Sequence, residues 1–86
     1  MNMDKIIEEI KIERDRQHSL PGSEWDKRNT PGDWVSIISH YSSGEVRRNG
    51  INPNADDFKD SLIKSAAVII ACLENLDEMI SRNELN

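Results

Sequence analysis

The chain of 86 residues has a single cysteine, Cys72, so it cannot form an intrachain disulfide. A chain of this length buries only about 60–65% of the surface that its unfolded form exposes, so a monomer would be marginally stable. A small protein without disulfides generally belongs to a reducing compartment and gains stability from another source. We therefore expect an oligomer in the cytoplasm.

Positive charge is also scarce, because 11 Lys and Arg residues stand against 16 Asp and Glu residues and give a formal net charge of −5. This balance argues against general nucleic-acid binding, which requires a basic face, but it leaves room for a local site for a small anion. The longest uncharged stretch near the C-terminus, residues 65–73, is too short to span a bilayer. The acidic N-terminal segment MNMDKIIEEI does not resemble a secretory signal.

Apolar periodicity predicts one helical domain over residues 1–86, built as an antiparallel bundle of three main helices. The first helix is expected from about Asp4 to Gln17 and is followed by the helix-breaking SLPGS. Its apolar stripe continues into two polar residues, Arg14 and Gln17. The aliphatic members of this stripe are Met3, Ile6, Ile7 and Ile10.

The second helix is predicted to begin at Thr30, an N-cap residue followed by Pro31 and, three positions on, by the capping-box acid Asp33. It should end in the segment RRNG at Gly50. One face carries apolar and aromatic side chains, which predicts that Trp34 anchors the core at the first turn. The members of this face are Trp34, Ile37, Ile38 and Tyr41.

The third helix is predicted from Asn52–Pro53 or Asn54 to about Ser81, and its middle is apolar nearly all the way round. We expect this helix to be covered on a second side by another subunit. Ala67 and Ala71 would allow the close approach, so a charge at either should split the assembly. The main stripe consists of Phe58, Leu62, Ala66, Ile69, Leu73, Leu76 and Ile80.

The polar end of the first helix is one candidate binding site. Arg14 and Gln17 continue the apolar stripe, so they either extend over the core edge or point into a polar pocket. In a pocket, the arginine fork would suit phosphate or carboxylate.

Trp25 lies in a polar loop beside Lys27 and Arg28. It either packs as a lid on the core or stacks on a flat ligand such as a base. The two basic neighbours either meet an anionic ligand or face solvent.

His40 and Tyr41 lie on the second helix, and Asp60 and Lys64 lie four residues apart on the third. Their ordinary interpretation is a solvated histidine, a core-edge tyrosine and a surface ion pair. The sequence has no histidine or cysteine at metal-ligand spacing, no glycine-rich phosphate loop and no nucleophile elbow, so we expect no metal or cofactor and no catalytic residue. Burial in an apolar segment would raise the pKa of Cys72, which argues against a catalytic thiol.

Taken together, the segments IERDRQ, EWD, GDWVSIISHY and DFKDSLIKSAAVIIACLENLD resemble a known family. They are similar to short proteins of phages and prophages related to the MazG-like all-α nucleoside triphosphate pyrophosphohydrolases. The resemblance spans about residues 11–77. It implies an all-α fold and, in active members, Mg²⁺ held by clustered carboxylates.

This chain departs from that pattern at the metal site. His40 and Tyr41 stand where the paired acids would be, Gly44 stands at the third acidic position, and Lys64 replaces an acid on the closing helix. A lysine cannot help to bind Mg²⁺, but it can contact a phosphate directly. The resemblance therefore implies a degenerate metal site.

These observations lead to the hypothesis of a non-catalytic protein that binds a nucleotide-like anionic small molecule. Trp25 would stack on the base, and Gln17 is a further ligand-binding candidate at the pocket. The contacts to phosphate or ribose would come from Arg14, His40, Tyr41 and Lys64. If the chain is phage-encoded, one use would be to sequester a linear or cyclic nucleotide signal of the host's defence in the host cytoplasm.

Two alternatives remain open. One is a Mg²⁺-dependent nucleoside triphosphate pyrophosphohydrolase that uses Glu45, Asp57 and Asp60 in shifted positions. The other is a small inhibitor that binds a protein through its acidic surface.

Overall fold

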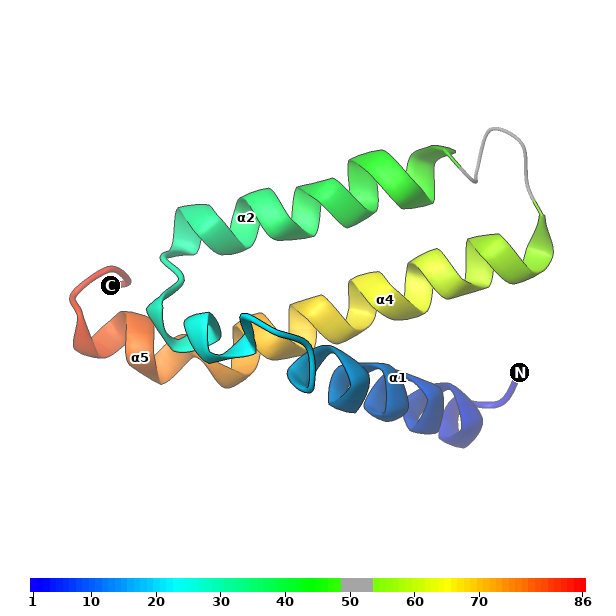
Figure 1. The fold of residues 1–86 in the computed structure, drawn as a ribbon, viewed down its shortest axis with the longest axis horizontal. Helices are drawn as coiled ribbons and strands as arrows, with labels where there is room; N and C mark the ends of the chain where they lie inside the picture. Colours follow the sequence, from blue (N-terminus) through cyan, green and yellow to red (C-terminus); the bar gives the residue numbers. More distant parts are fainter. Residues whose placement is uncertain (49–53) are drawn as a thin grey trace.

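The computed structural model describes residues 1–48 and 54–86, which are helical apart from short connections and the two ends. Figure 1 shows α2 running antiparallel to α1 and α4, with α4 between the other two. The expected all-α class is therefore confirmed. The elements in chain order are α1 (Met3–His18), the 3₁₀ helix η1 (Ser23–Arg28), α2 (Pro31–Ser39), the π-helical η2 (His40–Val46), α4 (Ala55–Glu74) and α5 (Leu76–Ser81).

Helix α1 begins where Asn2 caps it, because the Asn2 side chain accepts a hydrogen bond from the Lys5 backbone N–H at 2.9 Å. It ends at His18, one residue beyond the predicted end. The chain then turns through Gly22, whose φ of 93° lies in the left-handed region that favours glycine. This turn starts η1, which brings residues 23–28 against the end of α1.

The predicted capping box at the start of α2 is confirmed. The Thr30 side chain accepts from the Asp33 N–H at 3.1 Å, and Asp33 accepts from the Thr30 N–H at 2.9 Å. The regular helix ends at Ser39 and continues as the wider π-helical turn of η2. Ser42, Ser43 and Gly44 are weak helix formers, which is consistent with the change of pitch. The predicted end at Gly50 lies outside the described residues.

The third predicted helix is in fact two helices, because α4 ends at Glu74 and α5 begins at Leu76. Asn75, at the break, has φ −106° and ψ 11°, and its buried amide donates to the Ala71 carbonyl oxygen at 2.7 Å. A side chain that bonds to the preceding turn offers the backbone an alternative to a continuous helix. Asn54, one of the two starts predicted for this helix, caps α4 through its side chain. The other predicted start, Asn52–Pro53, lies outside the described residues.

The core lies between α2 and the C-terminal half of α4, with α5 closing one end. Trp34 from α2 has only 2% of its surface exposed, so its predicted role as an anchor is confirmed. The face predicted for the second helix is also confirmed, because its other members pack around the same cluster. The buried cluster is Trp34, Val68, Ala71 and Met79, and the side chains packed against it include Ile37, Ile38, Tyr41, Cys72, Leu76 and Leu85.

The main apolar stripe predicted for the third helix does not form the core of the chain. Four of its seven members are exposed, whereas Ala67 and Ala71 on another face are buried within the chain. Small residues let α1 and α2 pack closely on α4, which explains why the alanine face turns inward. The expectation that a charge at Ala67 or Ala71 would act between subunits is therefore wrong. The exposed members are Leu62, Ile69, Leu73 and Ile80.

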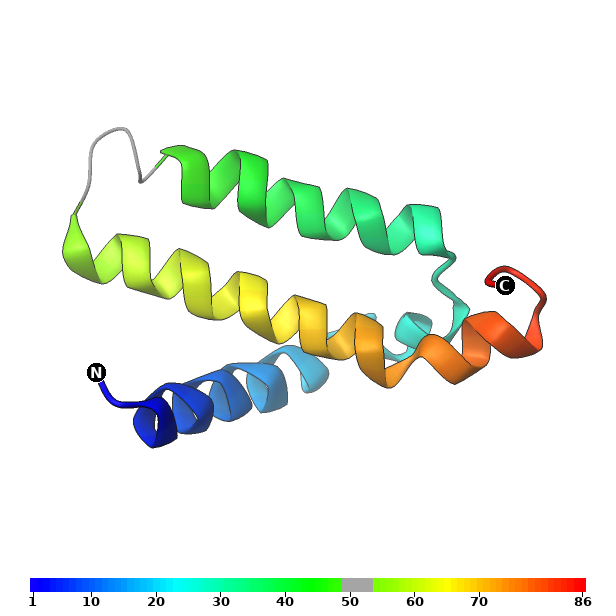
Figure 2. The same cartoon turned by 180° about the vertical axis from the view of Figure 1, so that it is seen from behind.

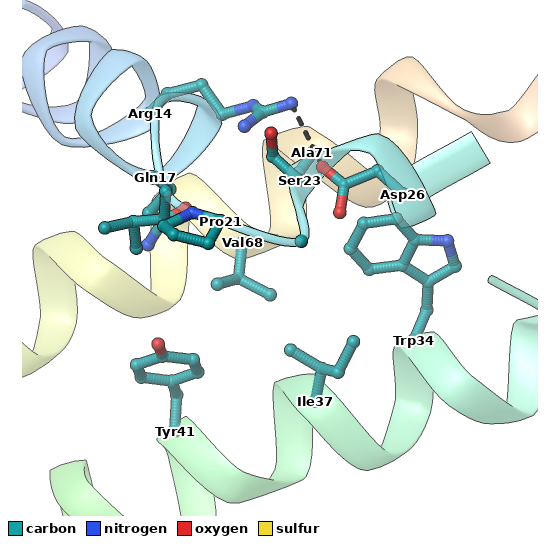
Figure 3. Close-up of a pocket in the computed structure, with 12 residues that line it drawn as sticks. Arg14, Gln17, Pro21, Ser23, Asp26, Trp34, Ile37, Tyr41, Val68 and Ala71 are labelled. Atoms are coloured by element: carbon teal, nitrogen blue, oxygen red, sulfur yellow. Dashed lines mark ion pairs between the residues drawn. The ribbon is translucent and has the colours of Figure 1, made fainter. Parts of the chain in front are cut away.

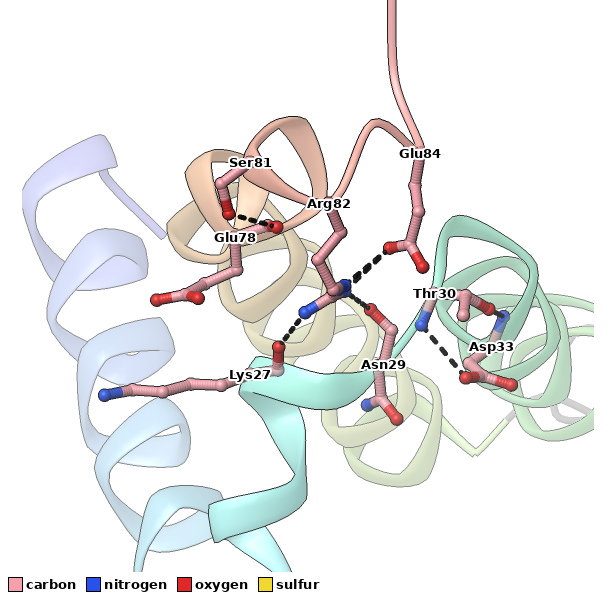
Figure 4. Close-up of polar contacts among 8 residues, drawn as sticks. All are labelled: Lys27, Asn29, Thr30, Asp33, Glu78, Ser81, Arg82 and Glu84. Carbon is pink, nitrogen blue, oxygen red and sulfur yellow. Dashed lines mark hydrogen bonds and ion pairs between the residues drawn. The ribbon is translucent and has the colours of Figure 1, made fainter.

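The C-terminal segment is attached to the loop that precedes α2. The Arg82 guanidinium donates to the carbonyl oxygens of Lys27 and Asn29, the latter at 2.8 Å, and also pairs with Glu84 at 2.8 Å. Figure 4 shows these contacts beside the capping box. Figure 2 shows, from behind, the C-terminus returning toward the start of α2. We call these contacts of Arg82 with the Lys27 and Asn29 carbonyl oxygens the Arg82 strap. The strap helps to fix the position of η1 relative to α5.

Among the helices in the described part of the chain, none combines the length and the apolar character needed to cross a membrane.

We predict that Trp34→Ala lowers the free energy of unfolding by about 3–5 kcal/mol, because it removes the largest side chain of the core. Trp34→Phe should cost less, because it keeps most of the apolar contact and removes the buried Nε1, which has no hydrogen-bond partner in the described structure. Urea denaturation followed by far-ultraviolet circular dichroism measures both.

Trp25→Ala is the matched control, because the Trp25 side chain lies in η1 and is 54% exposed. It should change the free energy of unfolding by no more than about 0.5 kcal/mol. Equal losses for the two alanine variants would contradict the assignment of Trp34 as the anchor.

Candidate functional site

A cleft of about 210 Å³ opens between α1, η1, α2 and α4 (Figure 3). Its floor is apolar, and polar side chains from α1 and η1 stand along one side. It includes three residues predicted from the sequence, Arg14, Gln17 and Tyr41. The other lining residues are Leu20, Pro21, Gly22, Ser23, Asp26, Trp34, Ile37, Val68 and Ala71.

The Arg14 guanidinium is held by two carboxylates from different elements. Its Nε donates to Glu74 Oε1 of α4 at 2.7 Å, and its Nη2 lies 3.6 Å from Asp26 Oδ2 of η1. Only 14% of the Arg14 side chain is exposed. The shorter contact is a charge-assisted hydrogen bond, whereas the longer one is a looser ion pair.

Asp26 was not predicted as a site residue. Partial burial raises the pKa of its carboxyl, while the nearby positive charges of Arg14 and His18 act in the opposite direction and the Glu74 carboxylate adds to the rise. The sequence places Asp26 next to Trp25 in a polar loop. No local pattern indicates that the turn at Gly22 brings it back to Arg14.

Gln17 is oriented by hydrogen bonds to its own helix, α1, and to α4. Its Nε2 donates to Glu13 Oε2 at 3.1 Å and to the Lys64 carbonyl oxygen at 3.4 Å. Glu13 also accepts from Arg16 at 2.7 and 2.8 Å. The hydrogen bond from Arg16 is the largest cause of the lowered pKa of Glu13, and Lys64 contributes to it through its charge. Gln17 is thus a fixed amide at the cleft edge.

Tyr41 and His40 are neighbours in η2 with different surroundings. The Tyr41 ring packs against the core and lines the cleft, while 70% of the His40 side chain is exposed. The rings meet edge to face with centroids 5.4 Å apart. His40 Nε2 lies 4.0 Å from Glu45 Oε1, so a protonated His40 faces a carboxylate.

Lys64 lines a second, more polar hollow of about 290 Å³ on the α4 side of η2. The three acids of the hydrolase alternative, Glu45, Asp57 and Asp60, line this hollow as well. Within residues 1–48 and 54–86, however, no group of three or more His, Cys, Asp or Glu side chains is arranged to hold a metal ion. Partial burial raises the pKa of the Cys72 thiol, as its apolar surroundings predicted.

Trp25 lines neither hollow. Its ring is stacked under the guanidinium of Arg28, which lies 4.7 Å from the ring centroid. The structure thus brings Arg14, Gln17 and Tyr41 to one cleft, and it places Trp25, His40 and Lys64 outside that cleft.

No protein-family model, curated protein or solved structure matches this chain.

We predict that Glu13→Gln lowers stability at neutral pH, because the pKa of Glu13 is lower in the folded protein than in the unfolded chain. A lowered pKa contributes stability above the unfolded value, near 4.5, and this contribution disappears as the pH falls through the folded value. The difference between wild type and variant should therefore shrink in acid. Urea midpoints measured across the acid range test this, and a difference that grows in acid would contradict it.

Proposed function

We propose that this protein is a non-catalytic binder of a nucleotide-like anionic small molecule. The observation that carries the proposal is the convergence of Arg14, Gln17 and Tyr41, from α1 and η2, on one mainly apolar cleft. Concave apolar surfaces with a few fixed polar groups are typical of small-molecule sites.

The polar and the apolar sides of the cleft would contact different parts of such a ligand. The Arg14 guanidinium is a planar donor suited to phosphate or carboxylate, and the Gln17 amide is a neutral donor and acceptor held by Glu13. The Tyr41 ring and the aliphatic floor offer a flat apolar surface for a base or sugar.

The cleft volume of about 210 Å³ is small for a whole nucleotide. Under this proposal one part of the ligand occupies the cleft, and the rest extends beyond it. His40, Lys64 and Trp25 would then contact the extended parts, either on the same subunit or across an interface between subunits.

The exposed apolar stripe on α4 supports assembly of the chain with further copies of itself. Leu62, Ile69 and Leu73 recur at helical spacing and are all more than 40% exposed. Exposed apolar patches of this kind commonly mark interfaces. We propose that a second copy covers this stripe, which retains the expected assembly through the C-terminal helical region while moving the contact away from the alanine face.

The biological use that we propose rests on the resemblance to short phage proteins related to the MazG-like pyrophosphohydrolases. A protein that binds a nucleotide without hydrolysing it can sequester a linear or cyclic nucleotide signal of a host defence system. The setting would be the host cytoplasm.

Calorimetric titration with ATP and with cyclic dinucleotides, with and without Mg²⁺, tests the proposal. We expect metal-independent binding to at least one of them, with the nucleotide recovered intact by mass spectrometry. Arg14→Gln should weaken that binding by about tenfold or more, the scale of a lost charge-assisted contact, while the control Lys11→Gln, an exposed charge on the same helix, should not.

Other outcomes would favour the alternatives. Magnesium-dependent release of pyrophosphate would favour a hydrolase, for which the acids of the second hollow are the specific candidates. Absence of binding to every nucleotide would contradict the proposal and favour a protein-binding inhibitor.

We predict that Leu73→Glu dissociates the oligomer while leaving the helical content unchanged, because Leu73 is 59% exposed and a charge there would be buried between subunits. Val35→Glu on α2 is the matched control, with a similar exposure of 63%. Sedimentation velocity measures the oligomeric state of the wild type and of both variants, and Val35→Glu should keep the wild-type state. A monomeric wild-type protein would refute the assembly.

A further inference from the structure

We propose that Asp26 is a built-in competitor for the anion site, which occupies part of the Arg14 guanidinium until a bound anion displaces it. The inference rests on the proposed function, in which Arg14 is the anionic contact. It adds a residue that sets how tightly an anion binds and how that affinity depends on pH. Asp26 thus acts on affinity through Arg14.

The geometry distinguishes the two carboxylates that hold Arg14. Glu74 Oε1 accepts a hydrogen bond from Arg14 Nε at 2.7 Å and fixes the orientation of the guanidinium. Asp26 Oδ2 lies farther away, at 3.6 Å from Arg14 Nη2. Both Arg14 and Asp26 line the cleft, and Glu74 does not. Figure 3 shows the Asp26 carboxylate beside the Arg14 guanidinium at the polar side of the cleft. An anion that enters the cleft would therefore contact the same side of the Arg14 guanidinium that Asp26 contacts.

Electrostatics also make the ion pair of Asp26 with Arg14 weaker than that of Glu74. The Asp26 carboxyl is partly buried, with a raised pKa, and Glu74 adds a second negative charge beside the same guanidinium. The charged groups that face it are Arg14 and His18 from α1 and Glu74 from α4. Protonation of Asp26 as the pH falls removes the competitor and strengthens anion binding. His18 is a second ionisable group beside Asp26, so a test must separate the two.

Sulfate is the suitable probe, because its charge stays constant over the pH range in which carboxyl groups and histidine titrate. The measurement is a titration of ¹⁵N-labelled protein with sulfate at constant ionic strength, read at the Arg14 Nε–H. At neutral pH we expect Asp26→Asn to bind sulfate about fivefold more tightly than wild type, the scale of one partly exposed ion pair. Asp15→Asn, the same charge change on an exposed residue beside Arg14, should leave the affinity unchanged.

The pH dependence provides the second comparison. Wild type and His18→Gln should both bind sulfate more tightly as the pH is lowered from neutral toward the range in which carboxyl groups titrate, whereas Asp26→Asn should show a smaller gain. Equal sulfate affinities for wild type and Asp26→Asn, or no sulfate binding at Arg14 in either protein, would overturn the inference.

Nucleotide titrations of the same variants separate this inference from the proposed function. Tighter sulfate binding by Asp26→Asn without any nucleotide binding would support the competition and contradict the function. Nucleotide binding that is unaffected by Asp26→Asn, together with unchanged sulfate affinity, would leave the function standing and overturn the competition.

Discussion

The burial of Trp34 is the contact on which the rest of the structure depends. This side chain joins α2 to Val68 and Ala71 of α4 and to Met79 of α5, so one residue connects three helices. It also forms part of the cleft that Arg14 lines from another side. In a chain with four aromatic residues, a single indole therefore fixes both the core and the apolar surface of the candidate site.

The polar side of the cleft depends on a different constraint, the turn between α1 and η1. Gly22 adopts a left-handed conformation, and the chain reverses there so that Asp26 returns to Arg14. The Arg82 strap holds the other end of η1 through backbone carbonyls. Arg14 is consequently placed between two carboxylates, and under the proposed function an anion entering the cleft would compete with Asp26 for it. That competition would make the affinity of the site depend on local charge balance as well as on shape.

Much of the local structure could be predicted because it depends on neighbouring residues. The capping box of Thr30 and Asp33 and the inward face of Trp34 each follow from short-range spacing. The break at Asn75 could not, because helical periodicity continues through it and only the hydrogen bond to Ala71 reveals the alternative backbone path. For the site, the stripe that ends in Arg14 and Gln17 indicated the cleft, whereas Asp26 gave no such signal.

The sequence by itself determined the helical class, the helix start at Thr30, and the polar end of the first apolar stripe, because these depend on spacing over a few residues. Only the tertiary structure decided which face of α4 is covered. The pattern favoured the larger aliphatic side chains, but close packing of α1 and α2 selected the face with Ala67 and Ala71 and left Ile69 and Leu73 exposed. Both faces are apolar, so the choice was made by the distance at which helices can approach, which depends on side-chain size.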